Sequence, residues 1–367
     1  MPAQDHPNPL AARVEAALPG VTPGVLLRAY CGGQLIHDIS VGETSRYYDL
    51  ASLTKIIFTQ QAMMQAFDRG LWHLQTRVVE ILADFPNQDI EIRELLTHSS
   101  GIEWWKPFYQ SLDPTLPWQA KRVWLYGELK KSSFVKTGKS IYSDLGFMLL
   151  GFVLEKMVGK SLLDIWTDTK ASSYPGTTLA FHIDNMPANQ RDLFAPTEDC
   201  AWRKKLLRGE VHDDNTWALG GLSTHAGLFG SIDDLSAFGL NLRAQLLGLQ
   251  GPQGLPGVGG ARGTGSRLVR QHTAQLFARR AVPREAGDWA LGFMLPALEG
   301  ASCGRHFSAA SVGHTGFTGT SVWYDPERDL LVLVLSNRVF FGRDNRAFLQ
   351  LRPQLHDWVV ESLPSAG

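Results

Sequence analysis

The sequence has 367 residues, a length that allows two domains or one large unit with two parts. Apolar residues make up 44% and charged residues 19%, a balance that excludes both long disorder and a coiled coil. The 35 Lys and Arg residues nearly equal the 36 Asp and Glu residues, so the chain lacks the basic field that collects nucleic acid or anionic lipid. We therefore expect neither nucleic acid nor a membrane as a partner.

The start of the chain and its cysteines bear on the compartment. Residues 1–18 contain no continuous apolar stretch of the kind found in a secretory signal, and nowhere do about 18 apolar residues run together. The three cysteines, Cys31, Cys200 and Cys303, are far apart and odd in number, which is typical of reduced thiols. These features predict a cytoplasmic protein.

The first seventy residues predict a helix, a hairpin and a second helix. Apolar positions at helical spacing indicate a helix over 10–18. Two strand-like runs, 25–30 and 34–41, are joined by a Cys-Gly-Gly turn whose glycines permit a positive φ. Residues 53–67 are apolar on almost every side, so we expect a buried helix there.

The rest of the chain changes from helices to strands. Helical patterns dominate up to about residue 250, among them 92–97, 146–158 and 233–247. The glycine-rich residues 251–265 predict an exposed linker with a domain boundary near it. The patterns beyond it predict four strands and a last helix, over 289–295, 311–316, 318–324, 330–340 and 346–363.

Strands near both ends of the chain indicate how it is organised. They predict the fold class α/β plus α, with an antiparallel sheet flanked by the N- and C-terminal helices and a helical second lobe. The sheet domain would contain residues 1–50 and 265–367, and the mainly helical domain 51–264. We expect the active-site cleft between them.

Ser52-Leu53-Thr54-Lys55, at the start of the buried helix, is the strongest local signal for chemistry. A spacing of three residues puts the Ser52 hydroxyl and the Lys55 amine on one helix face, where N–H groups also favour an oxyanion. A lysine in a low-dielectric cleft loses its proton readily and can then activate serine as a nucleophile. Taken alone, the pattern also fits an N-cap serine followed by a solvated lysine.

Two further segments carry weaker signals. Tyr142-Ser143-Asp144 precedes a helical pattern, and a tyrosine beside a lysine ammonium can relay a proton to or from a leaving group. His314-Thr315-Gly316 lies between two predicted strands, where Thr315 can donate a hydrogen bond and Gly316 lets a ligand approach the backbone. Taken alone, Tyr142 could equally be a half-buried packing residue, and His314-Thr315-Gly316 does not indicate a function.

In this order, the three segments resemble the boxes of the serine β-lactamase and penicillin-binding protein superfamily, which read SxxK, YxN and KTG or HTG. Residues 211–229 and 336–339 resemble its esterase and class C β-lactamase-related branch. The likeness extends from about residue 25 to 363, and it implies a β-lactamase-like fold that needs no metal and no cofactor. Other supporting segments are 48–51, 95–102 and 142–151.

The resemblance implies a role for each matching side chain. Ser52 would be the acylated nucleophile, Lys55 its activating base or the partner of that base, and Tyr142 the proton relay. His314 and Thr315 would bind a carboxylate or another polar group of the substrate.

The resemblance also implies an oxyanion hole at the end of the third box. It would consist of the backbone N–H groups of Ser52 and of Phe317, the residue after Gly316. One such donor is worth roughly 10²–10³ in rate, so these amides matter as much as any side chain.

Asp144 stands where the family has Asn. If Asp144 faces the cleft beside Lys55, its negative charge favours the ammonium form and weakens Lys55 as a base, which shifts the work to Tyr142. This departure speaks against recognition of amide substrates and against β-lactamase activity.

Two literal motifs lack the context that their chemistry needs. Lys136-Thr137-Gly138 reads KTG but precedes Tyr142 and lies in a loop before a helix, so we interpret it as a decoy. Ser302, within Gly300–Gly304, fits a GxSxG nucleophile elbow, but strands rather than a helix follow it.

Two other groups allow a structural and a functional interpretation. His212, Asp213, Asp214 and His225 could ligate a divalent ion, but adjacent residues rarely converge on one ion, which favours a hydrogen-bonded loop near the cleft. The pair Trp104-Trp105 either walls a substrate pocket or packs in the core.

The sequence therefore predicts a serine hydrolase that forms an acyl-enzyme on a small ester or amide, with an esterase favoured. One alternative is a D-alanyl-D-alanine-type peptidase or β-lactamase, for which a β-lactam or a peptide would be the ligand. Another is a ligand sensor or scaffold without turnover, which the unusual Asp144 and His314 suggest.

Overall fold

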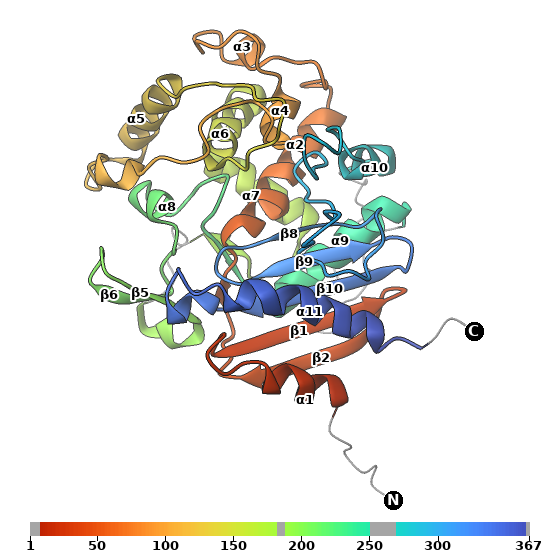
Figure 1. Cartoon of the computed structure of the whole chain (residues 1–367). Coiled ribbons are helices and arrows are strands. Elements are labelled where there is room, and N and C mark those ends of the chain that lie inside the picture. Colours follow the sequence, from red (N-terminus) through yellow and green to blue (C-terminus); the bar gives the residue numbers. More distant parts are fainter. Residues whose placement is uncertain (1–7, 182–187, 250–268, 365–367) are drawn as a thin grey trace, which may run out of the picture.

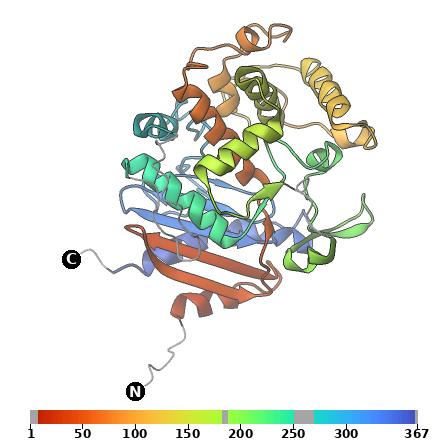
Figure 2. The same cartoon turned by 180° about the vertical axis from the view of Figure 1, so that it is seen from behind.

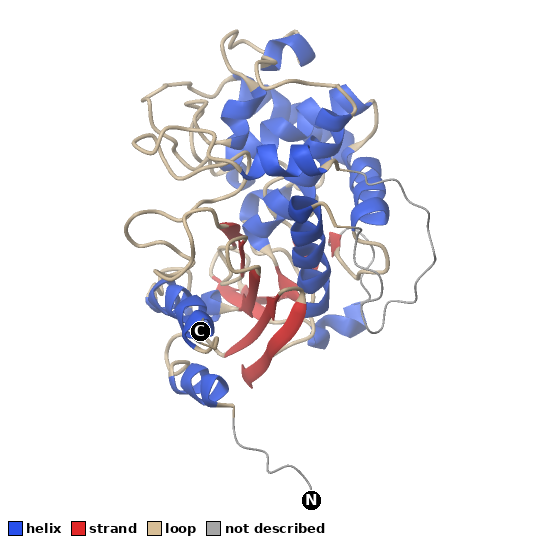
Figure 3. Ribbon diagram, turned by 90° about the vertical axis from the view of Figure 1, so that its right-hand side faces the viewer, coloured by secondary structure: helices blue, strands red, loops and turns tan. Residues whose placement is uncertain are grey.

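The computed structural model of the protein describes residues 8–181, 188–249 and 269–364 (Figure 1). A five-stranded sheet with helices on both faces makes up one part, and helices with long connections make up the other (Figure 3). The linker expected over 251–265 lies outside the described residues, as does the boundary placed near it. The division into two domains stays a prediction.

The large sheet joins both ends of the chain. It contains β1 (Gly24–Cys31), β2 (Gln34–Gly42), β8 (Val312–Thr315), β9 (Ser321–Asp325) and β10 (Leu330–Ser336). The strands are antiparallel and follow the order β2-β1-β10-β9-β8. Every residue of the central β10 is buried, as suits its run of Leu and Val. The predicted union of the N-terminal hairpin with the late strands is confirmed.

Helices cover both faces of this sheet. α1 (Pro9–Ala16) and α11 (Ala347–Glu361) lie on one face, as predicted for the terminal helices. α9 (Ile232–Leu247) lies on the other face (Figure 2). There Gly239 allows a close approach, because an added Cβ would lie 2.6 Å from a methyl group of Leu331 in β10.

The helical part is arranged around α6 (Asp144–Val158), in which residues 145–151 are all buried. A helix that is apolar on nearly every side belongs in the middle of a helical group. Among the helices of the described residues, none combines the length and the apolar character needed to cross a membrane. The other α-helices outside the sheet layers are α2 (Gln61–Asp68), α3 (Val78–Ile81), α4 (Ile92–Leu96), α5 (Trp118–Lys130), α7 (Leu162–Ser173), α8 (Asp214–Ala218) and α10 (Gln271–Ala278).

The described residues also form two smaller sheets, separate from the five-stranded sheet. β3 (Tyr48–Asp49), β7 (Leu228–Gly230) and β4 (Ala180–Phe181) form one sheet in the order β3-β7-β4. β5 (Pro196–Cys200) and β6 (Lys205–Arg208) form a hairpin. Because β3 ends three residues before Ser52, its pairing with β7 fixes the approach to the first box.

Three segments differ from the prediction. The helix expected over 53–67 begins as a 3-10 turn at Ala51–Leu53 and a π-helical segment at Lys55–Gln60 before α2, because a buried apolar pattern does not specify the helix type. Residues 289–295 form isolated bridges, Trp289 to Met294 and Met294 to Gly313, rather than a strand. The last predicted strand ends at Ser336, after which residues 338–341 form a 3-10 helix.

Leu333→Ala tests the central position of β10. Leu333 is fully buried, so its truncation should lower the free energy of unfolding by about 2–5 kcal/mol. Leu35→Ala is the matched control, because Leu35 is 52% exposed on the edge strand β2 and its loss should change stability by no more than about 0.5 kcal/mol. Urea unfolding of both variants measures the difference, and equal losses would contradict the assignment of β10 to the core.

Candidate active site

The three predicted boxes meet at one cavity of about 630 Å³. Ser52, Tyr142, Asp144 and residues 314–317 line it, whereas Lys55 is fully buried behind Ser52. Apolar and charged side chains are mixed in the wall, as is usual for a site that orients a small molecule. The other lining residues are Ala51, Trp104, Trp105, His212, Asp213, Asp214, His225, Ala226, Trp289, Met294, Arg338, Arg343, Leu349 and Arg352.

Ser52 is positioned by the turn that precedes it. Ala51 has a φ of 47°, a value uncommon for a residue with a side chain and typical of a tight turn. The buried carboxylate of Asp49 accepts hydrogen bonds from the backbone N–H groups of Ala51 (2.8 Å) and His212 (2.7 Å). Asp49 thus connects the turn before Ser52 to the loop at residues 211–214. Sequence reasoning gave Asp49 no role, although it stands three residues before the first box.

The ammonium group of Lys55 has three hydrogen-bond acceptors. Nζ lies 3.0 Å from Ser52 Oγ, 2.8 Å from Asp144 Oδ1 and 2.9 Å from the backbone oxygen of His225. These contacts use all three N–H donors of an ammonium group. The ring of Tyr142, whose centre is 4.9 Å from Nζ, adds a further favourable contact for a cation.

The neighbouring carboxylate decides the charge of Lys55. Burial alone would lower the pKa of Lys55, but the negative charge of Asp144 and the hydrogen bond between the two groups outweigh burial, so this pKa is raised. Lys55 is therefore an ammonium at neutral pH. In this state Nζ donates a hydrogen bond to Ser52 Oγ.

Tyr142 approaches Ser52 from the other side. Its hydroxyl lies 2.8 Å from Ser52 Oγ and donates to it. His98 fixes the backbone around Tyr142, because the N–H of Ile141 donates to His98 O (2.8 Å) and the N–H of Ser143 donates to His98 Nδ1 (3.0 Å). Burial raises the pKa of Tyr142, with the charge of Lys55 opposing it, so the phenol keeps its proton.

His314, in β8, is a neutral imidazole. Its Nδ1–H donates to the backbone oxygen of Thr315 over 2.8 Å. Burial and, to a smaller extent, the positive charge of Lys55 lower the pKa of His314 to about 3. A neutral ring cannot supply the positive charge that a lysine would bring to this position. The expected binding of a carboxylate by His314 therefore lacks an ionic component.

Gly316 and Phe317 complete the third box. An added Cβ on Gly316 would lie 2.1 Å from Thr320 Oγ1 and 2.7 Å from Leu50 O, so the protein itself fills the space that we had expected a ligand to use. Phe317 is 48% exposed and stacks on His212 with ring centres 5.5 Å apart. Within the described part of the chain, the N–H of Phe317 has no hydrogen-bond acceptor, so it is free for a ligand.

Two buried arginines beside the third box were not predicted. Arg338 Nε donates to Phe317 O (2.7 Å), and Arg352 Nη2 donates to Gly316 O (3.0 Å). Neither guanidinium has an ion-pair partner among the described residues. Burial and, to a smaller extent, the positive charge of Arg338 lower the pKa of Arg352 to about 9. The third box thus contains two guanidinium groups that form no ion pair within the described residues.

The loop with His212 and Asp214 is a network of ion pairs and hydrogen bonds. His212 Nε2 lies 2.9 Å from Glu198 Oε2, and Asp214 Oδ1 lies 2.7 Å from Arg203 Nη2. Asp213 caps α8 by accepting from the N–H of Thr216 (2.7 Å).

Metal-ligand atoms of Asp144, Asp213 and His225 lie within 4.8 Å of one another. However, Asp144 accepts from the Lys55 ammonium, and Asp213 Oδ1 lies 3.1 Å from His225 Nε2. A divalent cation there would meet the positive charge of Lys55 at close range, so this set of residues does not suit one.

The two motifs interpreted as decoys lie elsewhere. Lys136 is on the surface, where it pairs with Glu94 over 2.7 Å. Ser302 does not line the cavity, and the next regular element after it is the strand β8.

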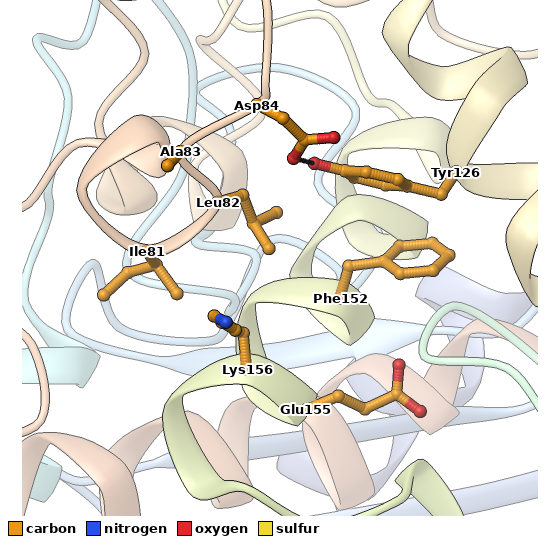
Figure 4. A pocket seen from close by; sticks show the side chains of 8 residues that line it. All are labelled: Ile81, Leu82, Ala83, Asp84, Tyr126, Phe152, Glu155 and Lys156. Atoms are coloured by element: carbon orange, nitrogen blue, oxygen red, sulfur yellow. Dashed lines mark hydrogen bonds between the residues drawn. The ribbon is translucent and has the colours of Figure 1, made fainter.

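A second cavity, of about 520 Å³, lies in the helical part (Figure 4). Asp84 in its wall accepts hydrogen bonds from Tyr126 (2.6 Å) and Lys130 (3.0 Å). None of the residues predicted for the active site lines this cavity.

The chain matches one family model, and it is similar to known hydrolases in sequence and in structure. The family model described as Beta-lactamase matches residues 11–353. The chain is 29% identical over 347 residues to an N-acetylmuramyl-L-alanine amidase of Bacillus subtilis, with 85% of this chain and 72% of that protein covered. It is 27% identical over 344 residues to a putative D-alanyl-D-alanine carboxypeptidase of Escherichia coli, with 85% and 73% covered. The structure of EstCE1, a hydrolase with promiscuous acyltransferase activity, shares the fold with a TM-score of 0.68 at 18% identity, over 95% of this chain and 98% of that one.

Asp144→Asn should move the alkaline limb of activity to lower pH. The variant lacks the charge that raises the pKa of Lys55, so the ammonium loses its proton at lower pH. The profile of kcat/KM for a p-nitrophenyl ester, from about pH 6 to about pH 10, reports this proton.

Asp213→Asn is the matched control for this pH profile. Its carboxylate lines the same cavity but is not among the groups that shift the pKa of Lys55, and Asn caps a helix as well as Asp does. We expect this variant to keep the alkaline limb of the parent. An Asp144→Asn profile that coincides with the parent profile would contradict the coupling.

Proposed function

The chain belongs to the beta-lactamase family and is a serine hydrolase, and we propose that it cleaves an amide bond of a small alanine-containing peptide through an acyl-enzyme on Ser52. The single observation that carries this proposal is the environment of one oxygen. Ser52 Oγ accepts hydrogen bonds from the Lys55 ammonium (3.0 Å) and the Tyr142 hydroxyl (2.8 Å) at the wall of the cavity. This is the arrangement of an activated nucleophile with a proton relay beside it.

The acylation step follows from these contacts. When substrate is bound, the phenol O–H turns toward the nitrogen of the leaving group and the Ser52 hydroxyl donates to the phenol oxygen. Ser52 Oγ then attacks the carbonyl carbon and gives its proton to the Tyr142 oxygen, while Tyr142 passes its own phenolic proton to the nitrogen of the leaving group. The C–N bond breaks, the amine departs and the acyl group stays on Ser52. Lys55 keeps its proton throughout, and its charge stabilises the negative charge that passes through the phenol oxygen.

Deacylation reverses this proton path. A water molecule attacks the acyl carbon and gives its proton to Tyr142, which returns a proton to Ser52 Oγ as the C–O bond breaks. In both steps, the backbone N–H groups of Ser52 and Phe317 would hold the oxyanion. The free N–H of Phe317 supports this role.

The substrate class rests on the relatives and on the arginines. Both curated relatives described above are named for amide bonds of alanine, and such peptides carry a carboxylate close to the bond that is cleaved. Arg338 and Arg352 supply positive charge at the third box, where His314 supplies none. We assign them the carboxylate, which replaces the role expected for His314.

An esterase is the second candidate. Asp144 accepts from Lys55 and has no N–H to offer an amide carbonyl, as the asparagine of the family could. Ester cleavage needs less proton transfer to the leaving group, so a site with a permanently charged lysine can perform it. A comparison of N-acetylmuramyl-L-alanine, an acyl-D-alanyl-D-alanine, nitrocefin and a p-nitrophenyl ester separates these candidates by kcat/KM.

Ser52→Ala should abolish covalent labelling by a fluorophosphonate. The intact protein should gain the mass of one adduct, and the variant should gain none, because no other hydroxyl in the described cavity has this pair of donors. Ser302→Ala, which removes the serine of the GxSxG motif, should be labelled like the parent. Labelling that persists in Ser52→Ala would refute the assignment, and a parent protein that is never labelled would favour the sensor without turnover.

Arg352→Gln should weaken binding of substrates with a free carboxylate. A hydrogen bond between charged groups contributes about 1.5–3 kcal/mol, so KM for N-acetylmuramyl-L-alanine should rise by about ten-fold or more. KM for the C-terminal amide of the same compound should hardly change, because that compound lacks the charge. An equal rise for both compounds would show that Arg352 acts on the shape of the cavity instead.

A further inference from the structure

A row of aromatic side chains begins in the cavity wall and continues beyond it. Trp104 and Trp105 line the cavity and are stacked, with ring centres 5.9 Å apart and planes inclined by 28°. The ring centre of Tyr109 lies 6.5 Å from that of Trp105, and the ring centre of Trp202 lies 4.7 Å from that of Tyr109. Trp104 is 61% exposed, so burial in the core does not explain this side chain.

The protein holds the exposed Trp104 and the half-buried Trp105 in a fixed place. The N–H of Asp144, in the second box, donates to Trp104 O over 3.0 Å. Asn215 anchors the same loop, since its Nδ2 donates to Lys106 O (2.8 Å) and its Oδ1 accepts from the N–H of Tyr109 (3.0 Å). A contact surface that is ordered before binding loses little entropy when a ligand docks on it.

The surroundings of the pair limit the chemistry of its ligand. The same cavity is lined by the charged side chains of Asp213, Asp214 and Arg343, and a lipid chain would displace the water around them without offering them hydrogen bonds. A pyranose ring suits both the indole faces and the charged side chains of the cavity. Its face of C–H groups stacks on the electron-rich face of an indole, and the hydroxyl groups at its edge bond to carboxylates and guanidinium groups.

We propose that Trp104 and Trp105 form a subsite for the pyranose ring of a sugar that is attached to the acyl side of the substrate. This inference rests on the proposed function, since it extends the peptide substrate to a glycopeptide. Trp104 then contributes specificity rather than catalysis. The sugar is held beside the second box, and the amide to be cleaved reaches Ser52.

Binding to Ser52→Ala tests the subsite without any turnover. Isothermal titration calorimetry compares N-acetylmuramyl-L-alanine with N-lactoyl-L-alanine, which has the same amide and carboxylate but no sugar ring. We expect the sugar compound to bind about ten-fold more tightly or better, the size of effect that one good stacking contact supplies. Equal affinities would overturn the proposal.

Trp104→Ala in the same background should remove most of this difference and leave the affinity for N-lactoyl-L-alanine unchanged. Trp202→Ala is the matched control, because Trp202 is an exposed tryptophan of the same row that does not line the cavity, and it should keep the full difference. If Trp104→Ala weakens the binding of both compounds equally, the pair only shapes the cavity, and the sugar subsite is contradicted.

These binding measurements test the sugar subsite independently of the proposed hydrolytic mechanism. Discrimination between the two compounds by an enzyme whose Ser52 is never acylated would support the subsite and refute the hydrolytic mechanism. Acylation of Ser52 without any discrimination would refute the subsite and leave the mechanism standing.

Discussion

The buried ammonium of Lys55 is the contact on which the site depends. It connects the first box to the second through Asp144, and it connects both to the segment before β7 through the backbone oxygen of His225. A buried charge is tolerated only when its hydrogen bonds are complete, so these three partners must stay in place together. The position of Ser52 Oγ is therefore a consequence of how a cation is accommodated in the interior of the protein.

The charges of the third box are distributed in an unusual way. The histidine in β8 is neutral, while Arg338 and Arg352 bring two guanidinium groups to the backbone oxygens of Phe317 and Gly316. Positive charge therefore comes from the segment after β10 and from α11 rather than from β8 itself. Near Ser52, Lys55 is paired with Asp144, so the guanidinium groups without an ion-pair partner lie at the third box and not at the nucleophile.

Patterns within one element were predictable, and contacts between distant elements were not. The spacing from Ser52 to Lys55 and the glycine turn of the first hairpin are local, and strands near both chain ends allowed the sheet to be anticipated. Arg352 meets Gly316 only because α11 packs on the sheet, and Asp49 meets a residue 163 positions away. The π-helical segment at residues 55–60 leaves the apolar pattern of a helix unchanged, so the sequence does not reveal it.

The pairing of β1 with β10 has a consequence for biosynthesis. Residues 25–31 find their partners only when residues 330–336 have been made, because no other strand of the described chain occupies that side of β1. The β1–β2 hairpin can form early, but the other edge of β1 stays unpaired until β10 has been made, and such distant pairing is slow to form. The cavity at Ser52 needs residues 314–317 in its wall, so a nascent chain carries no complete active site until those residues have been made.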